Sequence, residues 1–197
     1  MVRLGHVFRN LIEDFPGTAF LRPHDEVFAR GAARLGPKPQ GLRIGLSWRG
    51  GTPAKSASQR SLSLARLAPK LETPDSEFVS LQYGDVAAET AAANAGLARE
   101  IRVFPAADID DFEELAGLIA NLDVVVSVQT AVVHLTGALG RDCRVMVPYN
   151  PIWRYTANAA TMPWYRSVRI FRQLTPDNWD PVIESVAETL RASRPPA

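Results

Sequence analysis

Three observations predict an α/β fold with a doubly wound parallel sheet. Short apolar segments alternate with helical patterns from Leu42 onward, which is typical of strands joined by helical crossovers. The segment Asp123–Val128 carries three consecutive valines with no polar alternation, as expected of a strand covered on both faces. The chain has 197 residues, 46% hydrophobic and 22% charged, which suits one well-buried core. We therefore expect a single α/β domain over residues 41–193.

The first forty residues lack this alternation, so residues 1–40 are predicted to form a short helical appendage. Leu4–Phe15 has the pattern of a short helix that Pro16 and Gly17 would end. His24–Leu35 carries a second helical pattern, and the Gly- and Pro-rich residues 36–41 predict a loop. At the other end of the chain, residues 194–197 predict a tail.

The first half of the main domain is expected to hold three strands, at Leu42–Trp48, Phe78–Gln82 and Ile101–Phe104. Ser61 or Ser63 can cap a helix that runs to Leu71, because a serine hydroxyl accepts from free amides of the first turn. Two further helices are expected, an alanine-rich one at Asp85–Ala95 and one at Phe112–Leu122 that Asp110 or Asp111 opens.

The second half begins with the valine-rich strand Asp123–Val128. The elements expected after it are a helix from Thr130 to Leu139, a strand at Arg144–Pro148, a long aromatic loop to Tyr165, a strand at Val168–Phe171 and a helix at Trp179–Ala192. Such an order of strands and helices predicts right-handed crossovers and helices on both faces of the sheet.

Composition narrows the classes of function. A net charge of +1 argues against a dedicated nucleic-acid binder. Cys143 is the one cysteine, so no intramolecular disulfide is expected, and its apolar surroundings predict a buried thiol. No apolar run approaches the ~20 residues that span a bilayer, and no signal peptide is recognisable, so a cytoplasmic protein is expected. Three histidines without paired spacing predict no metal site.

Ligands of open parallel sheets bind beyond the carboxyl ends of the strands, near the point where the strand order reverses. Four segments are expected to meet there because each follows a predicted strand. They are Ser47–Gly51, Gln82–Asp85, Ser127–His134 and Pro148–Trp153.

The segment Ser127–His134 turns from a strand directly into a helix. The free amides and dipole at such a helix start form a phosphate site. Thr130 can cap the helix or contact a phosphate, and Ser127, Gln129 and Thr130 could equally do no more than cap the turn. His134 lies about one turn after Thr130 and can point toward the same site, or can be a packed histidine.

Glycines and cations follow the first strand. Gly50 and Gly51 allow close approach of a ligand to the backbone, and Arg49, Lys55 and Arg60 could neutralise a diphosphate. The spacing matches neither the dinucleotide fingerprint nor a Walker loop, and the alternative is a solvated loop. The aromatic residues of Pro148–Arg154 and Met162–Tyr165 could stack on a nucleobase or line a sugar pocket, or they could cover a sheet edge or a domain interface.

An ordered series of segments resembles a known family of domains. The segments are Gly45–Trp48, Arg60–Leu64, Phe78–Gln82, Asp123–Leu135, Gly137–Gly140 and Trp164–Tyr165. In this order they resemble segments of glycosyltransferase-like domains that are linked to tetratricopeptide repeats. Those domains are similar to bacterial heptosyltransferases and, more remotely, to O-GlcNAc transferases. The resemblance covers roughly Leu21 to Leu190. It implies the GT-B architecture, in which two Rossmann-like halves face a cleft, and it identifies this chain as resembling the C-terminal, donor-binding half.

The resemblance implies roles for particular residues. Ser47 and Arg49 would lie near the donor phosphates, Arg60 matches a phosphate-binding lysine of heptosyltransferases, and Gln82 and Tyr83 would face the nucleoside. The expected substrate-binding residues are Ser47, Arg49, Gly50, Arg60, Gln82, Tyr83, Ser127, Gln129, Thr130, Ala131 and His134. No metal is expected, and no cofactor besides the nucleotide sugar as substrate.

Two departures from the family leave alternatives open. Gln129 stands where the family usually carries an aspartate, and the N-terminal half, which supplies the acceptor site and usually the catalytic carboxylate, is not in the sequence. The first hypothesis is a metal-independent glycosyltransferase domain that transfers a sugar to an acceptor hydroxyl when paired with that half. The alternative is a non-catalytic nucleotide-binding or protein-interaction module, and a third is an unrelated nucleotide-binding regulator. Expected partners are the N-terminal half, a tetratricopeptide segment or a second copy of the chain.

Overall fold

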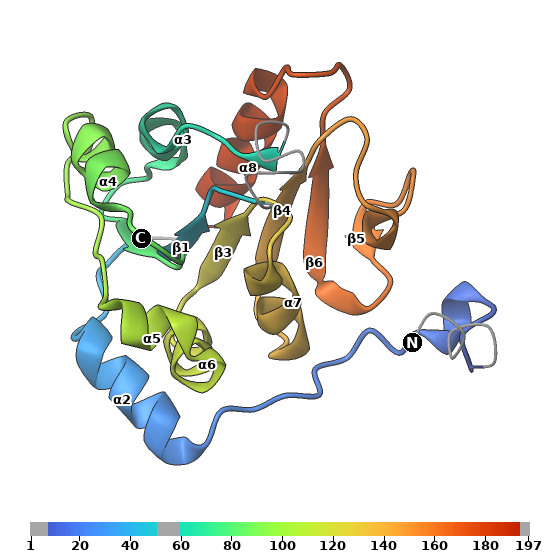
Figure 1. Ribbon diagram of the computed structural model, residues 1–197, viewed down its shortest axis with the longest axis horizontal. Helices are drawn as coiled ribbons and strands as arrows, with labels where there is room; N and C mark the ends of the chain where they lie inside the picture. Colours follow the sequence, from blue (N-terminus) through green and yellow to red (C-terminus); the bar gives the residue numbers. More distant parts are fainter. Residues whose placement is uncertain (1–7, 51–59, 194–197) are drawn as a thin grey trace.

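The computed structural model describes residues 8–50 and 60–193 and contains a six-stranded sheet with the order β2-β1-β3-β4-β6-β5 (Figure 1). Five strands are parallel, and the short β5 pairs antiparallel with β6 at one edge. The strands are β1 Arg43–Ser47, β2 Glu77–Ser80, β3 Val124–Ser127, β4 Cys143–Val147, β5 Thr161–Met162 and β6 Tyr165–Arg172. The predicted doubly wound parallel sheet is confirmed.

The strand order reverses at β1. This strand pairs with β2 on one side, where Ile44 is opposite Phe78, and with β3 on the other, where Ser47 is opposite Ser127. The chain leaves β1 toward β2 and later returns to the far side of β1 as β3. The carboxyl ends of β1 and β3 therefore form the point at which doubly wound folds bind ligands.

The predicted strand Ile101–Phe104 is reduced to a single bridge between Val79 and Arg102. Two backbone hydrogen bonds hold it, from the Arg102 N–H to the Phe78 carbonyl (2.9 Å) and from the Ser80 N–H to the Arg102 carbonyl (2.8 Å). The ladder ends there because Pro105 already precedes the helix α5. The prediction of a full strand was wrong, although Arg102 does lie beyond β2, where the third strand of a Rossmann sheet runs.

Helices cover both faces of the sheet, with α3, α4 and α8 on one face and α5, α6 and α7 on the other (Figure 1). The α-helices are α2 Asp25–Leu35, α3 Leu64–Leu71, α4 Ala87–Asn94, α5 Ala106–Asp110, α6 Phe112–Ala120, α7 Ala131–Ala138 and α8 Asp180–Ala192. The 3-10 turns are η1 Ile12–Asp14 and η3 Trp153–Tyr155. In these described residues no helix is long and apolar enough to cross a membrane.

The short helix predicted at Leu4–Phe15 does not run through the described part of that segment, where Phe8 is helical and the separate turn η1 follows. Its apolar side chains, among them Leu11 and Ile12, are exposed, so no core contact supports a longer helix. The Asp14 carboxylate accepts from the amides of Asn10 and Leu11 and closes the turn instead. The sequence prediction also missed α5, because five residues are too few to show a helical period.

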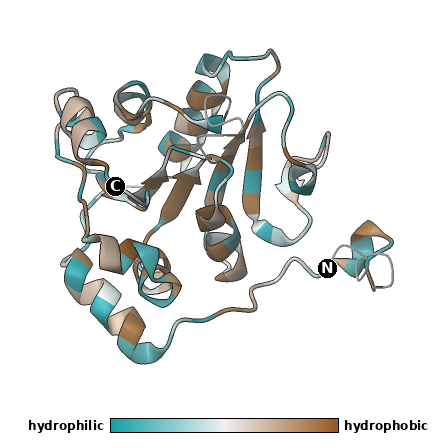
Figure 2. Ribbon diagram, viewed as in Figure 1, coloured by the Kyte–Doolittle hydropathy of each residue, from teal (hydrophilic) through white to brown (hydrophobic). Residues whose placement is uncertain are grey.

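The valines of β3 explain why the sequence shows no alternation there. Val124 and Val126 pack in the apolar cluster beneath α3 and α8, whereas Val125 packs in the cluster beneath α6 and α7. Successive strand residues point to opposite faces, and here both faces are covered (Figure 2). Cys143 is buried in the second cluster, as predicted, and burial raises the pKa of its thiol.

The helix caps follow the prediction in one case and depart from it in another. The Asp111 carboxylate accepts from the amides of Glu113 and Glu114 at the start of α6, which confirms an aspartate cap. Ser63 is the N-cap residue of α3, but its hydroxyl makes no capping bond. The hydroxyl of Ser61 bonds to the backbone of Gly50 instead. The serine expected at the helix start therefore supports the loop that follows β1.

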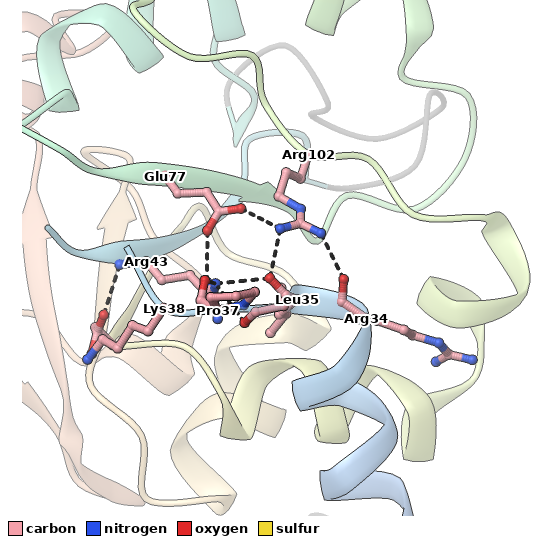
Figure 3. A network of polar contacts seen from close by, with 9 residues as sticks. Arg34, Leu35, Pro37, Lys38, Arg43, Glu77 and Arg102 are labelled. Atoms are coloured by element: carbon pink, nitrogen blue, oxygen red, sulfur yellow. Dashed lines mark hydrogen bonds and ion pairs between the residues drawn. The ribbon is translucent and has the colours of Figure 1, made fainter. Parts of the chain in front are cut away.

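The C-terminal end of α2 is held by cations from the sheet (Figure 3). The Arg43 guanidinium donates to the carbonyls of Leu35 (3.0 Å) and Pro37 (2.7 Å). Arg102 donates to the same Leu35 carbonyl (2.8 Å). Glu77 accepts from Arg43 at 2.9 Å and from Arg102 at 2.7 Å, so one carboxylate fixes both guanidinium groups. Cations at a helix C-terminus satisfy its free carbonyls, which ties the predicted appendage to β1 and β2.

Helix α2 also packs against α6 through two glycines. A Cβ added to Gly31 would collide with the Gly117 carbonyl, and one added to Gly117 would lie 2.6 Å from the Val27 carbonyl. The two backbones therefore touch directly.

Replacing Gly31 by alanine should lower the free energy of unfolding by about 1–3 kcal/mol through this collision. Without the collision, the better helix propensity of alanine would raise it by about 1 kcal/mol. Chemical denaturation measures the free energy of unfolding of the Gly31→Ala protein and of the unsubstituted chain. The Ala33→Gly variant, at an exposed position of the same helix, measures the effect of helix propensity alone. A Gly31→Ala protein more stable than the parent would contradict the close packing.

Candidate functional site

Three hydroxyl side chains meet where β1 and β3 end. The Oγ of Ser127 lies 3.0 Å from the Oγ1 of Thr130, and the Oγ of Ser47 lies 3.5 Å from the same atom. Thr130 is the N-cap residue of α7, but its side chain makes no capping bond. The first turn of α7 therefore keeps its N–H groups without a side-chain cap, and Ala131 at its start is exposed. Of the two roles predicted for Thr130, capping by its hydroxyl is wrong.

Gly50 lies where two other backbone segments come close. A Cβ at this position would lie 3.0 Å from the Arg60 carbonyl oxygen and 3.1 Å from the Gln129 carbonyl oxygen. The amide of Gly50 donates to the hydroxyl of Ser61 at 3.2 Å. The loop after β1, the segment before α3 and the start of α7 thus share one place at the switch point. Lys55, predicted to lie in the same loop, falls outside the described residues.

Gln82 follows β2 and is bound to the end of β1. Its Oε1 accepts from the amides of Trp48 (3.0 Å) and Arg49 (2.8 Å) and from the hydroxyl of Ser47 (3.3 Å). The side chain is 3% exposed, and its Nε2 has no partner among the described residues. Gln82 therefore joins the ends of β1 and β2 and retains one unpaired donor.

The guanidinium of Arg49 is engaged with the segment after β2. It donates to the carbonyls of Tyr83 (3.2 Å) and Asp85 (2.9 Å), and its Nε lies 3.2 Å from the carboxylate of Glu89. These contacts hold the group against the loop between β2 and α4. That Arg49 lies near the phosphates of a bound donor stays a prediction. Tyr83, on the same loop, has an exposed side chain.

A hollow of about 420 Å³ opens beside Gln82, between α4 and α5. Most of its wall is apolar, and the lining includes Val86, Ala87, Val103, Phe104 and Ile109. Ligand pockets in proteins have volumes of roughly 300–1,000 Å³ and combine apolar walls with few polar groups. The hollow therefore has the size and character of a small-molecule site.

Gln129 lies just before α7, and His134 is the fourth residue of that helix. The Gln129 side chain is 5% exposed, and neither its Nε2 nor its Oε1 has a hydrogen-bond partner in the described part of the chain. Burial, and secondarily the charge of Arg154, lowers the pKa of His134, which favours the neutral form of its imidazole. His134 packs between aromatic rings, with ring centroids 6.3 Å from Tyr155 and 5.9 Å from Tyr165.

Tyr155 was not predicted as a site residue; it is fully buried beside His134, and its hydroxyl has no hydrogen-bond partner among the described residues. Burial raises the pKa of this phenol. No spacing pointed to it, because its neighbour His134 lies 21 positions earlier in the chain. Of the aromatic residues predicted to meet the site, Tyr165 packs on His134, whereas Trp153 is 66% exposed and packs on Trp164, which in turn packs on Phe15. The segment Pro148–Trp153 therefore makes its ring contacts at the β5 side of the domain.

Comparison with known proteins places this geometry among glycosyltransferase folds. No model of a known protein family matches the chain. The chain is similar to E. coli ADP-heptose LPS heptosyltransferase II, with a TM-score of 0.65 at 16% identity over 94% of this chain and 57% of that one. A glycosyl transferase family 9 protein of Veillonella parvula has a TM-score of 0.61 at 10% identity, over 82% of this chain and 44% of that one.

The chain is also 33% identical to Protein FlbA of Caulobacter vibrioides over 186 residues, which are 93% of this chain and 31% of FlbA. It thus spans about a third of that relative and about half of the two solved structures. The structural likeness establishes the fold: this is a Rossmann-like, GT-B-type half, as the sequence resemblance implied. The link to tetratricopeptide repeats stays a prediction.

Proposed function

We propose that this chain binds the donor of a sugar-transfer reaction, a nucleoside diphosphate sugar. The observation that carries the proposal is the convergence of Gly50, Arg60 and the uncapped start of α7 at the switch point of the sheet. A helix N-terminus with free amides binds phosphate, and a glycine lets the ligand approach the backbone. The hollow beside Gln82 would then take the nucleoside.

In this proposal the diphosphate lies against the first turn of α7, with Arg60 as the positive side chain. The diphosphate is the leaving group of sugar transfer, and negative charge develops on it as the bond to the sugar breaks. Oriented amides and a guanidinium stabilise such charge in the transition state. The same groups would hold the donor before reaction.

Transfer further requires a base for the acceptor hydroxyl. A glutamine amide donates and accepts hydrogen bonds but takes no proton at neutral pH, so Gln129 would not supply that base. We propose that a carboxylate from a second half of the parent protein does so. Gln129 also favours a second candidate, a module of the same fold that binds the nucleotide and performs no transfer. Product formation from a nucleotide sugar by the full parent protein separates the two candidates.

Replacing Arg60 by glutamine should weaken binding of the preferred nucleoside diphosphate by about 10-fold or more, since a hydrogen bond to a charged group contributes roughly 1.5–3 kcal/mol. Isothermal titration calorimetry of the chain with ADP, GDP, UDP and their sugar derivatives measures the affinities. Arg66→Gln is the matched control, because Arg66 is half exposed on α3 and pairs with Asp180. Equal affinities of the two variants for the nucleotide would show that Arg60 does not contact it. If none of these nucleotides binds at millimolar concentration, the proposed function is overturned.

A further inference from the structure

A second hollow, of about 540 Å³, lies between the end of β6 and the start of α8. Residues 157–160, the last residues of β6 and the first turns of α8 form its wall. Most of the lining side chains are apolar, among them Ala157, Ala160, Ile170, Phe171, Leu174 and Val182. In the sheet, β4 stands between β6 and β3. This β6–α8 hollow is therefore separate from the switch point, and it has the size of a small-molecule site.

Arg172 is the one charged residue among the described residues that line the β6–α8 hollow. Its side chain is partly exposed, and its Nη2 donates to the carbonyl of Tyr155 at 3.0 Å. It belongs to none of the ion pairs formed within residues 8–50 and 60–193. Burial lowers the pKa of its guanidinium. The wall thus carries one positive charge without an anionic partner in the described part of the chain.

Nearby cations, in contrast, are paired. Arg169, on the same strand, lies 3.3 Å from the carboxylate of Asp142. Arg66 lies 2.6 Å from the carboxylate of Asp180, so the acid that begins α8 is already engaged. The complement that Arg172 lacks is an anion, and an occupant of the β6–α8 hollow could supply one.

The rest of the wall limits the kind of anion. Besides Arg172, the described lining includes polar side chains at Asn158 and Ser185 alone. A peptide would bring an N–H and a C=O group with each residue, and such groups need partners when they are buried. An acyl chain needs none, and burial of each of its methylenes is favourable. Apolar walls beside a single cation therefore favour an acyl chain that ends in a carboxylate.

We propose that the β6–α8 hollow binds a fatty carboxylate, with the carboxylate at Arg172 and the acyl chain along the apolar wall. This inference does not depend on the proposed function, because none of the residues placed at the donor site lines the hollow.

Isothermal titration calorimetry with decanoate and with decylammonium, each below its micelle-forming concentration, tests the proposal. The two probes have the same chain length and opposite charges, and decanoate should bind more tightly. Arg172→Gln should weaken decanoate binding by about 10-fold or more, because a hydrogen bond to a charged group is lost. Arg172→Lys keeps the charge and should keep the preference for decanoate. Ala157→Trp, at an exposed position of the wall, should weaken decanoate binding by filling the hollow.

Arg169→Gln is the matched control, because Arg169 is on the same strand, has a side chain that is 48% exposed and does not line the hollow. Its affinity for decanoate should stay within about twofold of that of the unsubstituted chain. The proposal is overturned if decanoate does not bind at millimolar concentration, if decylammonium binds as tightly, or if Arg172→Gln and Arg169→Gln have equal effects. A dimer in size-exclusion chromatography that Ala157→Trp converts into a monomer, without decanoate binding, would assign the hollow to a second copy of the chain instead.

Discussion

Replacing Glu77 by alanine should lower the free energy of unfolding by about 3–5 kcal/mol, the range measured when one partner of a buried ion pair is removed. Glu77 accepts from Arg43, whose side chain is 4% exposed, and from Arg102 (Figure 3). Without the carboxylate, the Arg43 guanidinium stays buried with carbonyl partners alone. The loss should also loosen the end of α2, because both guanidinium groups bind the Leu35 carbonyl.

Urea denaturation followed by circular dichroism measures this effect. Glu184→Ala is the control, because Glu184 pairs with Arg191 on α8 at 52% and 51% side-chain exposure. An exposed pair contributes about 1 kcal/mol or less, so the control should change the stability little. Equal losses from the two variants would show that the Glu77 network does not stabilise the fold.

Replacing Gly50 by valine should weaken binding of nucleoside diphosphates by about 10-fold or more, the size of effect expected when a hydrogen bond to a charged ligand group is lost. The new Cβ would lie 3.0 Å from the Arg60 carbonyl oxygen and 3.1 Å from that of Gln129, and both neighbours are backbone. The two γ-methyl groups would push these segments apart. Arg60 and the start of α7 would then no longer face one ligand together.

Calorimetry with the preferred nucleotide checks this expectation, and Gly96→Val is its control. Gly96 is exposed after α4, and the nearest atom to a Cβ there is the Pro69 side chain at 3.3 Å. The affinity of the control for the nucleotide should stay within about twofold of that of the unsubstituted chain. Nucleotide binding that survives in Gly50→Val would show that the three backbone segments at the switch point do not form the site.

The parts of the fold that depend on local pattern could be predicted from the sequence. The valines of β3 showed a strand covered on both faces, and Asp111 showed the start of α6. The extent of the segment around Arg102 could not be predicted, because its pairing depends on whether the chain stays beside β2 after the bridge. That outcome depends on the chain direction imposed by Pro105 and not on the apolar character of Ile101–Phe104.

The candidate site was predictable in its location more than in its contacts. Residues at the ends of β1, β2 and β3 were expected to meet, and Ser47, Gln82 and Thr130 do so. The engagement of Arg49 with the carbonyls of Tyr83 and Asp85 joins positions 34 and 36 residues apart, and no local spacing shows such a contact. The orientation of the Gln82 amide likewise depends on three donors from the end of β1 and the two residues after it.

In the function proposed for this chain, a nucleoside diphosphate binds at the start of α7 with its base beside Gln82. Nuclear magnetic resonance of the ¹⁵N-labelled chain, titrated with ADP, GDP and UDP, tests it most directly. We expect the amide signals of Gly50, Ala131 and Val132 and of the Gln82 side chain to shift together as one nucleotide saturates the protein. Shifts confined to the β5 side of the sheet, or no shifts at millimolar nucleotide, would contradict it.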